Sequence, residues 1–487
     1  MAAALYLDSR YEEALPLLRE AGIVYRQAIF IKSRPNSNPS VELDLAWSMQ
    51  LYSSCLGLTL SFSDAQDNCA QAIDVVRELQ SNTTVDTRAC LAKLLEGRGR
   101  LVQVDSEMEG LRAHSECVEI YRQLAASDPE RFEVSLVSSL RNLSCDMASC
   151  GDHSQAREMA LEAIVISRQL SAGSEVNVAQ SLTNLARCLI HSECSFDSIE
   201  PLQQAINIYR TLSVSDNPAY QIELESCLSA LLFVLDRHAR YDEAISLAKE
   251  SVDMYRQAVR ERTSPHDDQF LADWICKHAQ YLSVAGRNEE AIEHGAEAIA
   301  MYRILLEADR DKPRYSLVIS LKNQAQYLSE CGRYADAAEN AKEAISYLRL
   351  LLLGWDRISM DIFDRKLAEC LNNYAWYLTH VPGRADYEEA IEAGKEAVST
   401  QRALVEPWED DEAASLSQEL EVDLANYLHT LAHALNLAER YDDAVSLAKE
   451  SVSICCRLKL DLCVGDKYVA PLIDSLKACR DSLIGSQ

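Results

Sequence analysis

Residues 320–345 read SLKNQAQYLSECGRYADAAENAKEAI, and this stretch decides the fold. Its first part spaces apolar residues at helical intervals up to Gly332, and a second helical pattern follows from Tyr334. A glycine just past a helix can take the left-handed conformation that ends it. Ala337 and Ala344 are two helical turns apart, so both lie on one face and admit a neighbouring helix closely. The stretch predicts a pair of packed helices.

The same arrangement recurs along the whole chain. A phrase of an aromatic or polar residue, two acidic or polar residues, a small residue and an apolar one begins at Tyr11, Phe62, Glu107, His153, Ser195, Tyr241, Asn288, Tyr334, Tyr387 and Tyr441. The third residue after each start is small, and the tenth is Ala, Ser or Cys. Starts are separated by between 42 residues (153 to 195) and 54 residues (387 to 441). Repeated helix pairs therefore account for nearly the whole sequence.

Composition agrees with a helical chain. It has 15 Gly and 11 Pro among 487 residues, well below the roughly 12% that these two residues reach on average. Sandwiches, propellers and other turn-rich architectures need more chain breakers. Hydrophobic residues make up 48% of the sequence, which excludes a disordered chain.

Charge limits the class of partner. The chain has 47 Lys and Arg against 76 Asp and Glu, a net charge of −29. Such a surface repels nucleic-acid phosphates and anionic lipids, so we expect neither nucleic acid nor a membrane as partner. No apolar stretch approaches the ~18 residues of a membrane span, and the start does not resemble a signal peptide. We therefore expect a cytoplasmic protein whose 16 cysteines stay reduced.

The repeat resembles the tetratricopeptide repeat family. The family's three small positions correspond to Ala325, Ala337 and Ala344 in one copy, and to Ala432, Ala444 and Ser451 in another. The family's usual period of ~34 residues is shorter than the spacing here. The longer repeat is similar to the kinesin-light-chain-like branch and to arrays in fungal and cyanobacterial proteins. Over about residues 1–484, the resemblance implies an all-α fold, an α-solenoid wound as a right-handed superhelix.

Motifs of catalytic, cofactor or metal sites are absent from the sequence. GxxxxGK[ST], GxGxxG, GxSxG, HExxH and CxxC do not occur. His429 and His433 are spaced to share one helical face, but two ligands do not make a zinc site. We therefore expect no enzymatic activity, no cofactor and no metal.

A polar row on the first helix of each pair is the best candidate site. Eleven residues before the phrase, four copies carry Asn: Asn142, Asn184, Asn323 and, allowing for a longer turn, Asn373. In the tetratricopeptide family this position faces the concave groove, so the resemblance implies amides that hydrogen-bond the main chain of an extended peptide. Alternatively, these Asn hold helix pairs together or face solvent.

Cations and aromatic residues lie beside this row. Arg141 and Arg187 flank the first two Asn, and Lys277 and Lys322 flank the last two. In a chain of net charge −29, they would attract an acidic segment or a free carboxylate on a peptide partner. The aromatic residues on the same helices are Phe233, Tyr281, Tyr327 and Trp376. They form hydrophobic pockets beside the row or, alternatively, pack between repeats.

Two other charge patterns have structural interpretations. Nine copies carry Arg fifteen residues after the phrase begins, where a cation meets the negative end of its own helix and the unsatisfied carbonyls. The stretch Glu406–Asp423 is rich in acidic residues and lacks cations. We expect it to be a solvated loop leading into a helix, with a docking site for a basic partner as the alternative.

The sequence thus predicts one α-solenoid of about ten helix pairs over residues 1–467, beginning inside a repeat. A capping helix and tail follow at 468–487. The expected function is non-catalytic: the groove binds an extended peptide or a partner helix. As the alternative, the chain is a regulatory or sensing arm of a larger signalling protein whose nucleotide-binding or caspase-like protease part is absent here.

Overall fold

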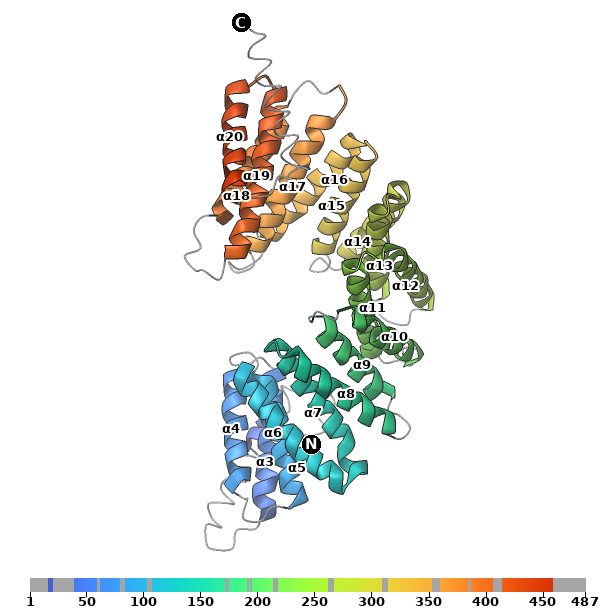
Figure 1. Cartoon of the computed structure of the whole chain (residues 1–487), viewed down its shortest axis with the longest axis vertical. Coiled ribbons are helices and arrows are strands. Elements are labelled where there is room, and N and C mark those ends of the chain that lie inside the picture. Colours follow the sequence, from blue (N-terminus) through green and yellow to red (C-terminus); the bar gives the residue numbers. More distant parts are fainter. Residues whose placement is uncertain are drawn as a thin grey trace. The chain divides into compact units, whose positions relative to one another are not determined.

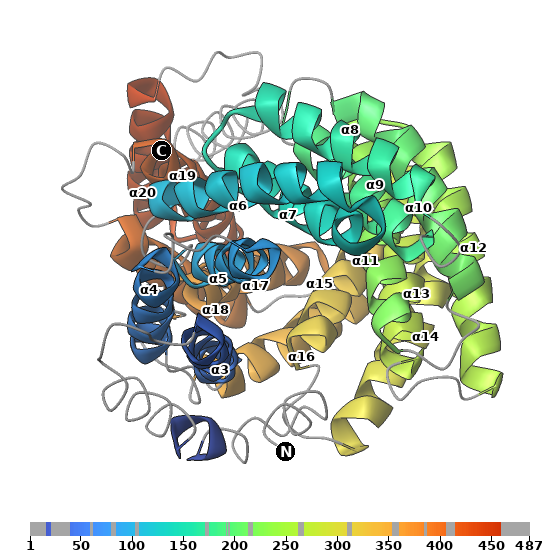
Figure 2. The ribbon, with the colours of Figure 1, turned by 90° about the horizontal axis from the view of Figure 1, so that it is seen from below.

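The computed structural model describes residues 16–20, 39–58, 62–78, 84–102, 107–170, 175–190, 192, 195–212, 218–261, 267–308, 314–352, 360–383, 387–405 and 414–458. These parts of the chain are all-α, and consecutive helices within each of two units pack against each other (Figures 1 and 2). The chain divides into two compact units, residues 1–239 and 240–487.

Unit 1 alternates first and second helices. Its first helices are α3 (Pro39–Leu58), α5 (Val85–Val102), α7 (Pro129–Ser149), α9 (Glu175–Ile190) and α11 (Pro218–Arg237). Its second helices are α4 (Phe62–Glu78), α6 (Glu107–Ser127), α8 (His153–Gln169) and, after the 3-10 turn η2 (Ser195–Ser198), α10 (Ile199–Leu212). The first helices of neighbouring pairs also contact each other directly, as α3 does with α5 and α7 with α9.

Unit 2 repeats this order. Its second helices are α12 (Tyr241–Glu261), α14 (Asn288–Ala308), α16 (Tyr334–Leu352), α18 (Glu388–Val405) and α20 (Tyr441–Arg457). Its first helices are α13 (Asp267–Val284), α15 (Arg314–Glu330), α17 (Met360–His380) and α19 (Ala414–Leu437). As predicted, the repeated phrase marks where the second helices begin, and α17 contacts α19 directly. The α-solenoid architecture is confirmed within the units.

The two small positions of each phrase form the centre of the helix packing. Every one of them that the structure describes is buried, and Ala65, Ala156, Ala291 and Ala344 have no exposed surface. Only a small side chain lets the neighbouring backbone approach this closely, so the pattern predicted from the sequence is the packing interface itself.

Left-handed residues end several first helices. Gly151, Gly286 and Gly332 have φ of 82°, 76° and 72°, as the turn prediction requires. Ala239 and Glu439 occupy the equivalent position with φ of 52° and 62°, where a side chain is strained. In the three glycine turns and at Glu439, the next residue's N–H donates back to the last helical turn, for example Arg440 N to Leu435 O at 2.9 Å.

The repeated Arg binds a partner other than the expected one. Its guanidinium reaches a carboxylate or amide on the next second helix instead of its own helix's carbonyls. The pairs are Arg77–Glu116 (2.9 Å), Arg122–Glu162 (2.5 Å), Arg168–Gln204 (3.1 Å), Arg256–Glu297 (2.8 Å), Arg303–Glu343 (2.7 Å), Arg349–Glu396 (2.7 Å) and Arg402–Glu450 (2.7 Å). We call these pairs the arginine ladder. They connect second helices of successive repeats within each unit.

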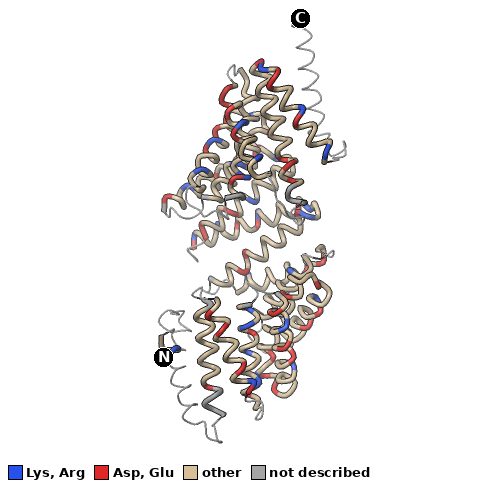
Figure 3. The backbone as a smooth tube through the Cα atoms, turned by 90° about the vertical axis from the view of Figure 1, so that its left-hand side faces the viewer, with Lys and Arg blue, Asp and Glu red and all other residues tan. Residues whose placement is uncertain are grey.

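Acidic and basic residues occur along the helices of both units (Figure 3). Within the described parts of the chain, no helix is long and apolar enough to cross a membrane. The helix and tail predicted at 468–487 lie outside the described residues. Winding into one continuous right-handed superhelix stays a prediction.

Candidate functional site

Four of the predicted site residues line one pocket in unit 1. Arg141 and Asn142 come from α7, and Asn184 and Arg187 come from α9. The pocket has a volume of about 470 Å³, and α11 contributes another part of its wall. We call it the α7–α9–α11 pocket. These four residues, which the sequence singled out on two successive first helices, therefore lie around one pocket.

Asn184 connects the two helices of this pocket. It is buried, and its Nδ2 donates to the main-chain oxygen of Arg141 at 3.4 Å. Its Oδ1 accepts from the Arg187 guanidinium and from the Cys145 thiol, each at 2.9 Å. The amide is thus occupied by its own chain, which favours the alternative that Asn184 holds repeats together. Asn142, by contrast, has no hydrogen-bond partner for its side chain among the described residues.

The pocket carries two guanidinium groups. Arg141 donates to Gln180 Oε1, and Arg187 donates to the Cys145 sulfur at 2.7 Å. Burial lowers the pKa of Arg141, yet arginine stays protonated at neutral pH. Neither group forms a salt bridge with any carboxylate in the described part of the chain. Glu223 also lines the pocket, so the two arginines and this carboxylate together give the pocket a net positive charge.

An apolar wall completes the pocket. Ile190, Leu202, Ala230 and Phe233 line it. Phe233 is 54% exposed, which is unusual for a large aromatic side chain on a packed helix. The aromatic position predicted beside the polar row is therefore open to solvent on α11.

The predicted site residues of unit 2 have partners within their own unit. Lys277 Nζ lies 4.3 Å from the centroid of the Trp274 ring. Asn323 hydrogen-bonds with Cys276, and Asn373 Oδ1 accepts from Asn372 at 3.4 Å. The Asn323 contact connects α15 to α13 and agrees with the structural alternative for the polar row, whereas Lys277 and Asn373 contact residues of their own helices.

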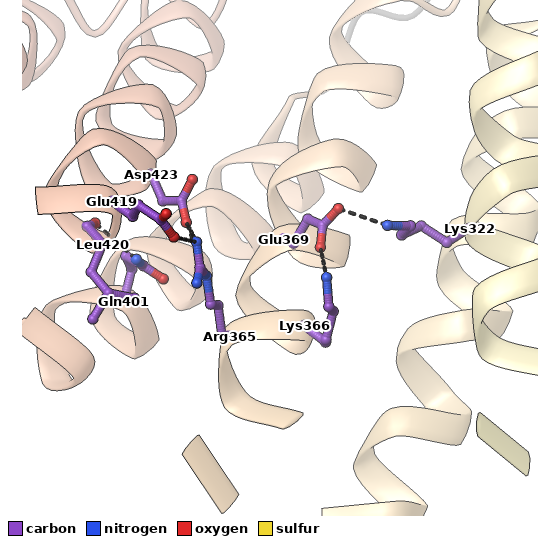
Figure 4. A network of polar contacts seen from close by, with 8 residues as sticks. All are labelled: Lys322, Arg365, Lys366, Glu369, Gln401, Glu419, Leu420 and Asp423. Atoms are coloured by element: carbon purple, nitrogen blue, oxygen red, sulfur yellow. Dashed lines mark hydrogen bonds and ion pairs between the residues drawn. The ribbon is translucent and has the colours of Figure 1, made fainter. Parts of the chain in front are cut away.

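Lys322 is neutralised by the chain itself, as Figure 4 shows. It binds Glu369 at 2.8 Å, and Lys366 binds the same carboxylate at 3.0 Å. Burial would raise the pKa of Glu369, but the two ammonium groups outweigh it and lower that pKa. On the next first helix, α19, Asp423 and Glu419 bind Arg365 of α17 at 2.9 and 3.4 Å. The end of the acidic stretch 406–423 thus forms ion pairs between the first helices α17 and α19.

The three aromatic residues predicted beside the polar row in unit 2 differ in exposure, and Tyr281 is buried. Tyr327 is 3% exposed and belongs to the packing between helices. Trp376 is partly exposed and contacts the rings of His380 and His433 in tilted arrangements, with centroid distances of 4.1 and 5.5 Å. Only Trp376 is positioned to contact a partner.

Sequence reasoning missed Gln180, Glu223, Arg365 and Glu369. Gln180 and Glu369 each precede a predicted Asn by four residues, so helical spacing alone could have placed them on the same face. Nothing comparable in the sequence marks Glu223 or Arg365.

A second cavity, of about 390 Å³, lies among α18, α19 and α20. Its lining includes Arg402 and Arg440, whose charges are already paired with Glu450 and Asp443. No group of three or more potential metal ligands occurs among the described residues. Two unpaired guanidinium groups therefore distinguish the α7–α9–α11 pocket.

No curated protein matches the sequence. Among solved structures, the chain is similar to BtubC from P. vanneervenii, with 16% identity over 52% of this chain and 94% of that one, and a TM-score of 0.41. A putative kinesin light chain from Podospora anserina shows 18% identity over 44% and 95% of the two chains, with a TM-score of 0.35.

A signal-transduction ATPase with a tetratricopeptide-repeat sensor from Pyrococcus horikoshii shows 14% identity over 91% of this chain and 65% of that one, with a TM-score of 0.43. A family model described as tetratricopeptide repeat matches residues 424–458, which belong to α19 and α20. The same helix pair, with the same two buried small positions, recurs in both units. The segment 424–458 is therefore a tetratricopeptide repeat, and the described helices of both units repeat its architecture.

Proposed function

We propose that the chain is a non-catalytic protein-interaction module whose first helices bind an extended peptide. The α7–α9–α11 pocket carries this proposal, because polar groups from successive first helices converge in it. Tetratricopeptide repeats are typically protein- or peptide-binding modules, which supports the same assignment.

Hydrogen-bond chemistry favours a peptide as the ligand. An extended peptide leaves its own N–H and C=O groups unpaired, and an amide side chain offers a donor and an acceptor on one rigid group. Asn142 lines the pocket with its amide unoccupied by any described residue. Phe233 adds an apolar surface for a side chain of the peptide. A regulatory arm of a larger signalling protein, the alternative, would use the same surface.

Selection from a peptide library tests the proposal. The full chain would be immobilised and panned against random peptides, and the affinity of an enriched peptide would be measured by fluorescence anisotropy. We expect Asn142→Ala to weaken binding about 5- to 10-fold, the worth of one hydrogen bond of about 1 kcal/mol. Arg349→Gln, on the arginine ladder, is the matched control and should bind normally.

A second variant tests whether the polar row of unit 2 also contacts the peptide. Asn323→Ala combined with Asn373→Ala should also weaken binding if the polar row of both units contacts the peptide. The proposal fails if no peptide is enriched over a heat-unfolded sample, or if neither Asn142→Ala nor the double variant changes the affinity of an enriched peptide.

A further inference from the structure

The core of unit 1 contains a histidine at a packing position of the repeat. Seven residues after the phrase begins, every other copy carries Ala, Gly, Leu or Cys, whereas the third copy carries His114. This side chain of α6 has no exposed surface, and its Nδ1 lies 2.5 Å from Oδ2 of the buried Asp146 on α7. We call these two residues the His114–Asp146 pair. Ionisable side chains are rarely this buried without a partner, so the pair is a specific feature of this joint between repeats.

The backbone of α5 makes room for the imidazole ring. A Cβ atom at Gly99 would lie only 2.3 Å from His114 Nε2, so a side chain at 99 and the ring in this position exclude each other. The same Nε2 lies 3.3 Å from the main-chain oxygen of Glu96. One imidazole therefore connects three helices, α5, α6 and α7.

These two contacts of the ring locate its hydrogens. A carbonyl oxygen only accepts, so Nε2 carries a hydrogen and donates it to Glu96 O. A neutral imidazole has a single N–H, which would leave a lone pair on Nδ1 facing a carboxylate oxygen at 2.5 Å. The contact therefore needs a second hydrogen between Nδ1 and Oδ2, belonging either to an imidazolium or to a carboxylic acid. In both cases the pair holds one shared proton and has no net charge.

The ionisable neighbours of the pair keep their own charge states in neutral and mildly alkaline solution. On α5, the buried Glu96 carboxylate is bound by Lys93 at 2.8 Å and by Arg100 at 3.6 Å. On α6, burial raises the pKa of the Cys117 thiol to about 12, and on α7 burial raises the pKa of the Cys145 thiol. Among these groups, the shared proton is thus the one that a rise in pH can remove.

The pair is also connected to the α7–α9–α11 pocket through α7. Asp146 directly follows Cys145 and lies about one helical turn beyond Asn142, and these two neighbours line the pocket. The position of α7 against α5 and α6 therefore sets the position of this wall of the pocket.

We propose that the His114–Asp146 pair is a proton-dependent joint. With the shared proton bound, it holds α7 against α5 and α6. When the proton leaves to solvent, a ring lone pair faces a carboxylate inside the core, and this repulsion loosens α7 together with the pocket wall that it carries. The effect on peptide binding rests on the proposed function, whereas the movement of α7 does not.

Nitrogen NMR of the full chain, with histidine isotopically labelled at both ring nitrogens, tests the hydrogen positions. The His114 signals would be assigned by their loss in His114→Gln. At neutral pH we expect a hydrogen on Nε2, with Nδ1 either protonated or hydrogen-bonded to a carboxylic acid. A ring whose Nε2 carries no hydrogen overturns the inference.

Two variants replace the proton-dependent contact with a permanent one. In Asp146→Asn, the amide oxygen accepts from the Nδ1–H of a neutral imidazole, and in His114→Gln, the amide N–H donates to the carboxylate. Hydrogen–deuterium exchange of segment 138–146 would be measured without peptide at pH ~6.5, where an ordinary histidine is half protonated, and at pH ~9. Relative to the variants, we expect the wild type to exchange equally at the lower pH. At the higher pH it should exchange about 5- to 10-fold faster, the effect of one lost hydrogen bond.

Peptide affinity gives the functional readout. An enriched peptide with blocked ends and no titratable side chain should bind the wild type about 5- to 10-fold more weakly at the higher pH, and the two variants equally at both. His153→Gln, a histidine of unit 1 outside the pair, is the control and should behave as the wild type. Unchanged exchange in the wild type, or variants that follow its pH dependence, overturns the inference alone. The expected exchange without any peptide binding supports the joint and contradicts the proposed function.

Discussion

Single residues set the packing and the turns of this array. Small residues at two fixed positions of each phrase are buried wherever the structure describes them, and their regularity made the helix pairs predictable from the sequence. The role of Asn184 was not predictable in this way. Its amide is occupied because α7 and α9 lie close enough for it to reach the Arg141 carbonyl, and that distance depends on the packing of whole helices.

Ala239 and Glu439 take the left-handed conformation that glycine takes in the equivalent turns. Ala239→Gly should therefore raise the free energy of unfolding by up to about 1 kcal/mol, because it relieves the strain of a side chain at positive φ. Chemical denaturation followed by circular dichroism measures this change. Ala300→Gly, in the exposed interior of α14, is the control and should lower stability by about 1 kcal/mol. A loss of stability in both variants would contradict the account.

Stability should also depend on the protonation of His278. Burial, together with nearby His294, lowers its pKa from 6.5 to about 4. Between these values the unfolded chain binds a proton that the folded chain does not, so stability falls as the pH drops from 6.5 towards 4. Urea unfolding midpoints across this range should show a weaker pH dependence for His278→Gln. An identical pH dependence in the variant would rule out His278 as a cause.

Between helices, the arginine ladder connects successive repeats. The positions nine residues after each phrase start hold Glu or Gln in all copies, and the Arg of the preceding copy reaches them. This regularity is visible in the sequence, but copies differ in length, so the distance between partners ranges from 36 to 48 residues. Only the helix packing shows which residues meet. The tenth copy carries Cys456 where the others carry Arg.

A double-mutant cycle measures one rung of the ladder. For Arg349→Gln and Glu396→Gln, we expect a coupling of about 0.2–1 kcal/mol, because both side chains are largely exposed and the pair is screened by water. The coupling should shrink in 1 M salt. A cycle of Arg349 with the exposed Glu392, with no contact between them in the structure, should give almost none. Equal coupling in both cycles would mean that the ladder does not connect α16 and α18.

At the scale of the whole molecule, the repeat predicted the fold better than the site. Helix pairs follow from local spacing, whereas the α7–α9–α11 pocket needs three helices that lie up to about 90 residues apart in sequence, from Arg141 to Phe233. Lys322 looked like an available cation in the sequence. Its neutralisation by Glu369 depends on contact between α15 and α17. We therefore expect a charged ligand to bind in unit 1 rather than along the whole polar row of first helices.

Hydrogen–deuterium exchange with a bound peptide tests the central claim, that first helices carry the binding surface. After addition of a peptide enriched from the library, we predict slower exchange in segments 138–146, 180–187 and 223–233. Segments of the second helices, such as 395–402, should exchange at an unchanged rate. Slower exchange confined to the second helices, or spread evenly over the chain, would contradict the account.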